Sequence, residues 1–311
     1  MDTAVARVAD WWRRVLASDV LHSFRSSRLV MLSAAVAAIY FSGAMLAPWL
    51  APQDPFDLAK LQLLDAFTPP VWMEGGEARF PLGSDNQGRD VLSTIMFGSR
   101  VSLLVGVASV LFAMLLGVTL GLISGYVGGS VDAFIMRVAD IQLSFPAILI
   151  ALLIDGMVRL AIPGSRHTEL AVLVLILSIG LSFWVQYART VRGVTMVEKN
   201  KEYVLAARVI GVPPALIMLR HVLPNVMGPT LVIATINLAT AVITEATLSF
   251  LGVGVPPTQP SLGTLIRIGN DFLFSGEWWI TIFPGAALAI LVLSVNLLGD
   301  WLRDALNPKL R

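Results

Sequence analysis

Residues 101–125 read VSLLVGVASVLFAMLLGVTLGLISG, an apolar stretch without a charged side chain. A helix needs roughly 20 mostly apolar residues to cross the ~30 Å hydrocarbon core of a bilayer, so this stretch is long enough to span one. Similar stretches occupy residues 29–51, 141–163, 169–187, 229–252 and 279–298. The sequence therefore predicts an all-α polytopic membrane protein with six transmembrane helices, and five is the next best count.

The composition of the whole chain agrees with a membrane protein. Of its 311 residues, 56% are hydrophobic and 14% are charged, whereas a soluble domain carries about 25% charged residues. The net charge of +1 argues against a nucleic-acid-binding protein, which would show a strongly basic face. The chain has no cysteine, and its three histidines lack the spacing of metal ligands. We expect no disulfide, no metal site and no nucleic-acid partner.

The motifs of common enzymes are missing from the sequence. None of the lysines follows a glycine, so the chain has no phosphate-binding P-loop. It contains neither the H-E-x-x-H pattern of zinc proteases nor the G-x-S-x-G pattern of serine hydrolases. We therefore expect no catalytic residue and no cofactor bound by this chain.

The distribution of Lys and Arg predicts the orientation. Fifteen of them lie in residues 1–28, 126–140, 188–228 and 299–311, and six lie in residues 52–100, 164–168 and 253–278. Because basic residues favour the cytoplasmic side, we expect both termini to be cytoplasmic in the inner membrane of a bacterial cell.

These boundaries divide the chain into segments. Residues 1–28 are predicted to be a cytoplasmic tail, with an interfacial helix around Trp11 and Trp12. The first span at 29–51 leads to an extracytoplasmic loop at 52–100, which is rich in Pro and Gly. Residues 101–300 are predicted to form the core transmembrane domain, and 301–311 a cytoplasmic tail.

The polar segment 188–228 is expected to contact something in the cytoplasm. A helix is predicted from Glu202 to Ile210, with Tyr203, Ala206, Ala207 and Ile210 on one face. Gly211 is expected to end this helix, and a second short helix is expected from Ala215 to Val222.

The small pair Ala206–Ala207 would let another surface approach closely, and charges at the rim would come from Glu202, Arg208 and Arg220. A short helix held between two spans could be moved as a rigid body.

The same segment resembles a known motif. Ala206–Ala207, Gly211 and Leu223–Pro224 are spaced as in the E-A-A-x-x-x-G-x9-I-x-L-P loop of ABC importer permeases, although Leu205 and His221 replace its glutamate and isoleucine. Three further stretches resemble the C-type subunit of the dipeptide/oligopeptide/nickel branch: PLGSDNQGRDVLS at 81–93, LSFLGVGVPP at 248–257 and NLLGDWLRDALNP at 296–308. The likeness covers about residues 28–311.

This resemblance implies a type I ABC importer permease fold, in which the loop docks into an ATPase subunit. The residues implied in coupling are Glu202, Tyr203, Ala206, Ala207, Arg208, Gly211, Arg220, His221 and Pro224. The implied partners, besides membrane lipid, are a homologous B-type permease, two ATPase subunits that hold ATP and Mg, and an extracytoplasmic substrate-binding protein. Short peptides are the expected cargo, and nickel chelates, glutathione or oligosaccharides are the alternatives.

Several residues within the spans allow two interpretations each. Gly117, Gly121 and Gly125 recur every four residues, which favours close helix packing over substrate contact. Pro146 either kinks a span near a gate or occupies a first helical turn. Glu245, a carboxylate well inside a span, should face protein or water; it either pairs with polar groups across a subunit interface or meets the amino terminus of a peptide. Asn237 is expected to form an interhelical hydrogen bond.

Two other functions are alternatives. If Glu245 carried protons, the chain would be a proton-driven secondary transporter. The chain could also be a membrane sensor that transports nothing.

Overall fold

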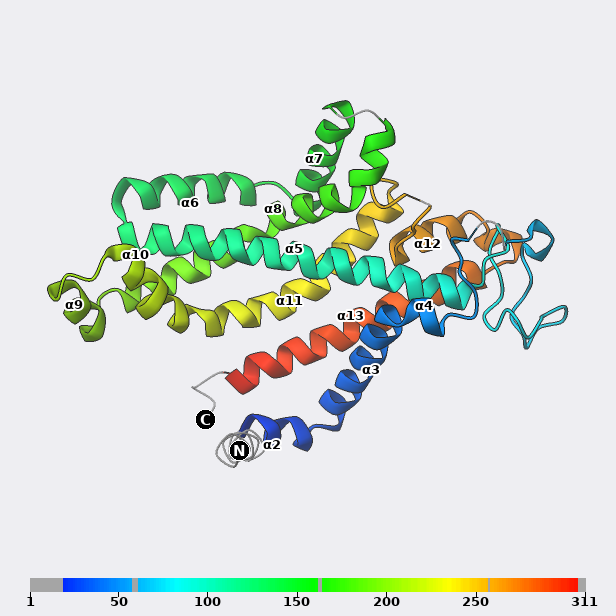
Figure 1. Ribbon diagram of the computed structural model, residues 1–311, viewed down its shortest axis with the longest axis horizontal. Coiled ribbons are helices and arrows are strands. Elements are labelled where there is room, and N and C mark those ends of the chain that lie inside the picture. Colours follow the sequence, from blue (N-terminus) through cyan, green and yellow to red (C-terminus); the bar gives the residue numbers. More distant parts are fainter. Residues whose placement is uncertain (1–18, 58–60, 162–163, 257, 307–311) are drawn as a thin grey trace, which may run out of the picture.

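The computed structural model describes residues 19–57, 61–161, 164–256 and 258–306. Within them the chain forms helices and loops, and the one extended pairing is an isolated bridge between Ser84 and Asp90. Five helices are long and apolar enough to span a membrane, and Figure 1 shows the longest of them side by side along the molecule. These helices are α3 (Arg28–Met45), α5 (Val91–Val127), α8 (Gly164–Glu198), α11 (Leu223–Phe250) and α13 (Trp279–Leu306). The predicted all-α membrane fold is confirmed.

The third span differs from the prediction. In place of one helix at 141–163, the chain forms α6 (Gly129–Leu143) and α7 (Ala147–Ala161), which are bent by 94° relative to each other. The count is six only if this bent pair is taken as one span. The break lies at Ser144–Phe145–Pro146, because proline lacks an amide hydrogen and disfavours helical backbone in the residue before it. Residues 129–140, expected in a cytoplasmic loop, instead form α6, which runs back beside α5 (Figure 1).

Two helices extend well beyond their predicted spans. Helix α5 begins at Val91, inside the expected 52–100 loop, and its 37 residues measure about 55 Å. Helix α8 includes the expected linker at 164–168 and continues to Glu198, into the expected 188–228 loop. Hydropathy identifies only the part of a helix that is apolar enough to face lipid, so it does not predict where a helix continues into less apolar residues. In α8 the extension is supported by ion pairs to α6, including two bonds between Arg192 and Asp132 of 2.5 and 2.7 Å.

Helices α5 and α8 pack through the three glycines that recur along α5. A Cβ atom added at Gly117 would lie 2.4 Å from the carbonyl oxygen of Trp184. At Gly121 it would lie 2.6 Å from the carbonyl oxygen of Ala188, and at Gly125 it would meet the side chain of Thr195. The backbones of α5 and α8 therefore come closer than a residue with a side chain would allow at these three positions. Glycines spaced four residues apart favour this close packing of helices.

One end of the bundle is covered by residues 51–57 and 61–90 and by α12 (Leu262–Asn270). Arg89 and Asp85 form a buried ion pair at 2.6 Å, and Asp90 caps the start of α5 by accepting a bond from the Ser93 amide. The indole of Trp279 donates a hydrogen bond of 3.0 Å to the carbonyl of Ser84. The stretch 81–93 thus ties the loop to both α5 and α13.

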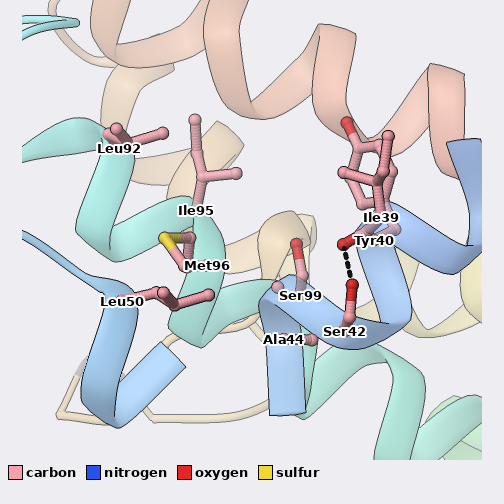
Figure 2. Close-up of a pocket in the computed structure, with 10 residues that line it drawn as sticks. Ile39, Tyr40, Ser42, Ala44, Leu50, Leu92, Ile95, Met96 and Ser99 are labelled. Atoms are coloured by element: carbon pink, nitrogen blue, oxygen red, sulfur yellow. Dashed lines mark hydrogen bonds between the residues drawn. The ribbon is translucent and has the colours of Figure 1, made fainter. Parts of the chain in front are cut away.

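The first span is the least buried of the five. Helix α3, the short α4 (Ala47–Leu50) and the start of α5 enclose a groove of about 460 Å³ (Figure 2). Its walls include Tyr40, Leu50 and Met96, and none of its lining residues is charged. The short helix α2 (Asp19–Ser26) precedes the span, and the predicted interfacial helix around Trp11 and Trp12 lies outside the described residues.

Candidate functional site

The end of the bundle opposite α12 carries the connection between α8 and α11 (Figure 1). We call residues 199–222 the coupling segment. It contains helix α9 (Glu202–Val209), the short helix α10 (Pro214–Ile217) and a π-helical turn, Met218–Val222. The prediction of a helix that starts at Glu202 is confirmed.

Gly211 ends α9 as the sequence predicts. Its φ of +82° is a left-handed conformation that glycine adopts at little cost. Its amide bonds to the carbonyl of Arg208 at 3.0 Å, and the amide of Val212 bonds to the carbonyl of Ala207, also at 3.0 Å. This pair of bonds, with Val212 packed near Ala207, fixes the direction in which the chain leaves the helix.

The structure separates the residues that the sequence places on one face of α9. Val204 and Ala207 are buried and pack in a cluster with Ile217, Val222 and Val226. Ala206 and Ile210, expected on the same face as Ala207, are exposed. Ala207, expected together with Ala206 to admit a partner surface, is instead covered by residues of this chain. These residues come from α10, the π-helical turn and α11.

The outer face of the coupling segment is apolar. Val209 is 87% exposed and Ile210 is 78% exposed. Three more large apolar side chains are exposed on α9, α10 and the π-helical turn: Leu205, Leu216 and Leu219. Where exposed apolar side chains gather on a surface that faces water, they mark an interaction site. Sequence reasoning missed Val209, Leu216 and Leu219, because their pattern becomes apparent only once the buried face is known.

Tyr203 joins α9 to its two neighbouring spans. Its hydroxyl donates to the Glu198 carboxylate at the end of α8, at 2.5 Å, and accepts a bond of 2.9 Å from the Asn225 side chain in α11. Its ring stacks on that of His221, with 6.5 Å between centroids. Burial and the adjacent Glu198 carboxylate raise the pKa of Tyr203 to about 12, so the hydroxyl remains a donor at neutral pH. Neither Glu198 nor Asn225 could be recognised as a partner of Tyr203 from the sequence pattern.

Arg208 and Lys199 hold the segment against the end of α5. The guanidinium of Arg208 lies over the ring of Tyr126, 5.0 Å from its centroid, and its Nε donates to the Tyr126 hydroxyl at 3.3 Å. The ammonium of Lys199 donates to the carbonyl of Gly125 at 2.7 Å. Of the three charges expected at the rim, Arg208 thus contacts α5, whereas Glu202 and Arg220 are exposed.

The second short helix, expected from Ala215 to Val222, is not a separate helix that ends at Val222. After α10 the chain forms the π-helical turn and continues directly into α11, with Pro224 in the first turn of that span. Proline has no amide hydrogen to complete a regular helical bond. In the π-helical turn, the amide of Leu223 bonds to the carbonyl of Met218, five residues earlier, in place of the carbonyl four residues earlier. The coupling segment and α11 are therefore continuous.

The other predicted site residues lie apart from the coupling segment. Glu245 is fully buried within the chain, where its carboxylate accepts bonds from Ser102 of α5 at 2.8 Å and from Ser249 at 2.7 Å. Asn237 is buried in α11, where its side chain faces the Tyr187 hydroxyl of α8, while Pro146 lies at the bend between α6 and α7. In the described part of the chain no group of acidic or histidine side chains could hold a metal ion.

Comparisons with known proteins agree with this architecture. Residues 117–311 match the family model described as "binding-protein-dependent transport system inner membrane component", and residues 16–70 match the "N-terminal TM domain of oligopeptide transport permease C". A di/tripeptide transport system permease of Pseudomonas aeruginosa is 41% identical over 268 residues, which are 86% of this chain and 84% of that protein. A glutathione transport system permease of Pectobacterium atrosepticum is 37% identical over 97% of this chain and 91% of its own length.

A solved structure shows the same fold. An inward-facing form of the MetNI methionine ABC transporter matches 69% of this chain and 96% of its own, with a TM-score of 0.53 and 21% sequence identity. Its long helices and those described above therefore share one arrangement. The chain belongs to the inner-membrane components of binding-protein-dependent transport systems, and it is a non-catalytic permease subunit of an ABC importer with the type I fold.

Proposed function

We propose that this subunit forms half of a translocation pathway for short peptides and that the coupling segment docks on an ATPase subunit. The observation that carries this proposal is the apolar outer face of α9, where Val209 and Ile210 are almost fully exposed. Exposure of such side chains costs free energy in water, roughly 25 cal/mol for each Å² of apolar surface. A partner that covers this face recovers that free energy.

The contacts of α9 supply a way to transmit motion. Tyr203 connects the helix to α8 and α11, Arg208 connects it to α5, and Gly211 fixes its end. A partner that pushes on α9 therefore moves the inner ends of three spans together. We propose that closure of the ATPases shifts the spans from an inward-open to an outward-open arrangement.

The proposed complex contains a second, homologous permease of the B type, two ATPase subunits and an extracytoplasmic substrate-binding protein. The family description, which names a binding protein, supports the last of these. ATP and Mg would be held by the ATPases, and this chain would hold no cofactor.

The proposed orientation places both termini in the cytoplasm. The excess of Lys and Arg in the terminal and 188–228 segments supports it. In Figure 1, α2 and the end of α13 lie toward the end of the molecule that carries α9. Both termini would then share the side on which the ATPases work.

Short peptides are the proposed cargo, and glutathione is the second candidate because a glutathione permease is among the relatives. Uptake by the complete complex in liposomes, with its binding protein, tests both the cargo and the energy source. We expect labelled dipeptide to enter only when ATP is present on the side of the ATPases, and to enter equally well after a proton ionophore is added. Uptake that needs a proton gradient and no ATP would instead identify a secondary transporter.

A further inference from the structure

A cavity of about 500 Å³ lies near the end of the bundle that α12 covers. One face of α5 forms a wall through Phe97, Arg100 and Leu104, which recur at helical spacing. Three other parts of the chain close it: Phe56 from the loop before α5, Val172 from α8, and the stretch Thr258–Gln259 that follows α11. Its volume falls within the range of pockets that bind small molecules, about 300–1,000 Å³.

Arg100 is the charged residue of this cavity. Its side chain is exposed, and within the described residues its guanidinium has no hydrogen-bond or ion-pair partner. No acidic side chain lines the cavity. Two other cations near this end are engaged, since Arg89 pairs with Asp85 and Arg79 pairs with Asp65. Arg267 of α12 has no hydrogen-bond partner for its Nε within the described residues, but it does not line the cavity. A free guanidinium offers a planar fork of donors that matches a carboxylate in a two-bond geometry.

The remaining walls suit a peptide. The rings of Phe56 and Phe97 meet edge to face, 5.3 Å apart, and present an apolar surface. Thr258 and Gln259 are exposed and carry a hydroxyl and an amide, groups that can donate to and accept from a peptide bond. One cation, one hydroxyl, one amide and an aromatic wall are thus gathered from three separate segments.

We propose that this cavity is a subsite for the C-terminal carboxylate of a short peptide, with Arg100 as the residue that binds the carboxylate. The proposal rests on the proposed function, because it assumes a peptide cargo. It adds that this subunit contacts the cargo directly and recognises its terminal charge, in addition to any selection by the binding protein. A lipid phosphate is the other oxyanion that Arg100 could meet, but one lipid headgroup would leave the aromatic wall and the Thr258 and Gln259 side chains unused.

The test compares Arg100→Gln with the unaltered protein in the complete complex, reconstituted in phosphatidylcholine vesicles. Uptake of labelled dialanine and of its C-terminal amide is measured at concentrations that saturate the binding protein. Since the binding protein is the same in every sample, the ratio of variant to unaltered uptake isolates the permease. We expect dialanine uptake to fall about tenfold or more, as is typical when a charged hydrogen-bonded pair is lost. The amide should be taken up within twofold of the unaltered rate.

Three controls make the result specific. Arg100→Lys keeps the positive charge but loses the planar fork of donors, so it should restore dialanine uptake only in part. Arg137→Gln removes an exposed cation from α6 and should change neither peptide. With the amide as cargo, the ATP hydrolysed per molecule taken up should be the same in Arg100→Gln and in the unaltered protein, which shows that coupling is intact.

The outcomes separate the alternatives. Equal losses for dialanine and its amide, or dialanine uptake within twofold of the unaltered rate, would overturn the assignment of Arg100. A loss that appears only when phosphatidylglycerol is added would also overturn it and would assign Arg100 to a lipid headgroup. If the unaltered complex takes up no peptide with ATP, the proposed function itself fails, which is a distinct result.

Discussion

At the scale of single residues, the conformation of Gly211 makes the clearest prediction. No atom lies near the position of an added Cβ, so the effect of Gly211→Ala comes from the left-handed backbone alone. A left-handed conformation costs an L-residue roughly 1–2 kcal/mol, and we expect this strain to displace the end of α9. Peptide uptake and the stimulation of ATPase activity should fall, while the amount of protein in the membrane stays the same.

Gly193 provides the matched control for this substitution. It lies within α8 and also has no atom near an added Cβ. Because alanine is favoured over glycine inside a helix by about 1 kcal/mol, Gly193→Ala should leave both activities intact. If Gly211→Ala behaves like Gly193→Ala, the end of α9 has no role in coupling.

The neighbours Ala206 and Ala207 should respond differently to the same substitution. Ala207 is buried against the cluster beneath α9, whereas Ala206 is exposed. Because a glutamate at position 207 would bury a charge, Ala207→Glu should detach α9 from the cluster beneath it. Limited proteolysis should then cleave the coupling segment faster. A glutamate at position 206 should leave cleavage unchanged and weaken ATPase binding in pull-down assays. Similar proteolysis of the two variants would contradict the observed orientation of α9.

At the scale of elements, the packing of α5 on α8 depends on the absence of side chains. A Cβ at Gly121 would lie 2.6 Å from a backbone carbonyl of α8, so Gly121→Ala must push the two helices apart. Overpacking of this kind costs about 1–3 kcal/mol, and we expect a lower unfolding temperature in detergent.

Gly156 in α7 is the control for this prediction, since an alanine there meets no atom within 4 Å. Gly156→Ala should unfold at the temperature of the unaltered protein. An unchanged unfolding temperature for Gly121→Ala would show that the two helices can separate at no cost.

The sequence predicts the elements better than it predicts their ends. The apolar stretches locate α3, α5, α8, α11 and α13, because burial in lipid requires an unbroken run of apolar residues. The polar ends of α5 and α8 escape this signal, since their stability comes from partners elsewhere in the chain, such as the pair of Arg192 with Asp132. The bend before Pro146 escapes it too, because proline is compatible with either a kink or a new helix start.

At the scale of the whole molecule, the sequence locates the coupling segment but only part of its exposed face. It places Ala206 and Ile210 together and misses Val209. The position of Gly211 and the length of the segment follow from local rules of helix termination. Which residues of α9 point outward depends on Ile217, Val222 and Val226, which come from later parts of the chain. In the same way, the cavity around Arg100 combines residues that are far apart in sequence.

The central claim is that the apolar face of α9 is covered by an ATPase in the assembled importer. Because the chain contains no cysteine, Val209→Cys creates a single thiol on that face, and a photoreactive maleimide attached there would label whatever lies against it. The control is Phe274→Cys, which is as exposed but lies beyond α12, at the opposite end. We expect position 209 to cross-link to an ATPase subunit and position 274 never to do so. Labelling at position 209 that yields only lipid or solvent adducts in the intact complex would contradict the account.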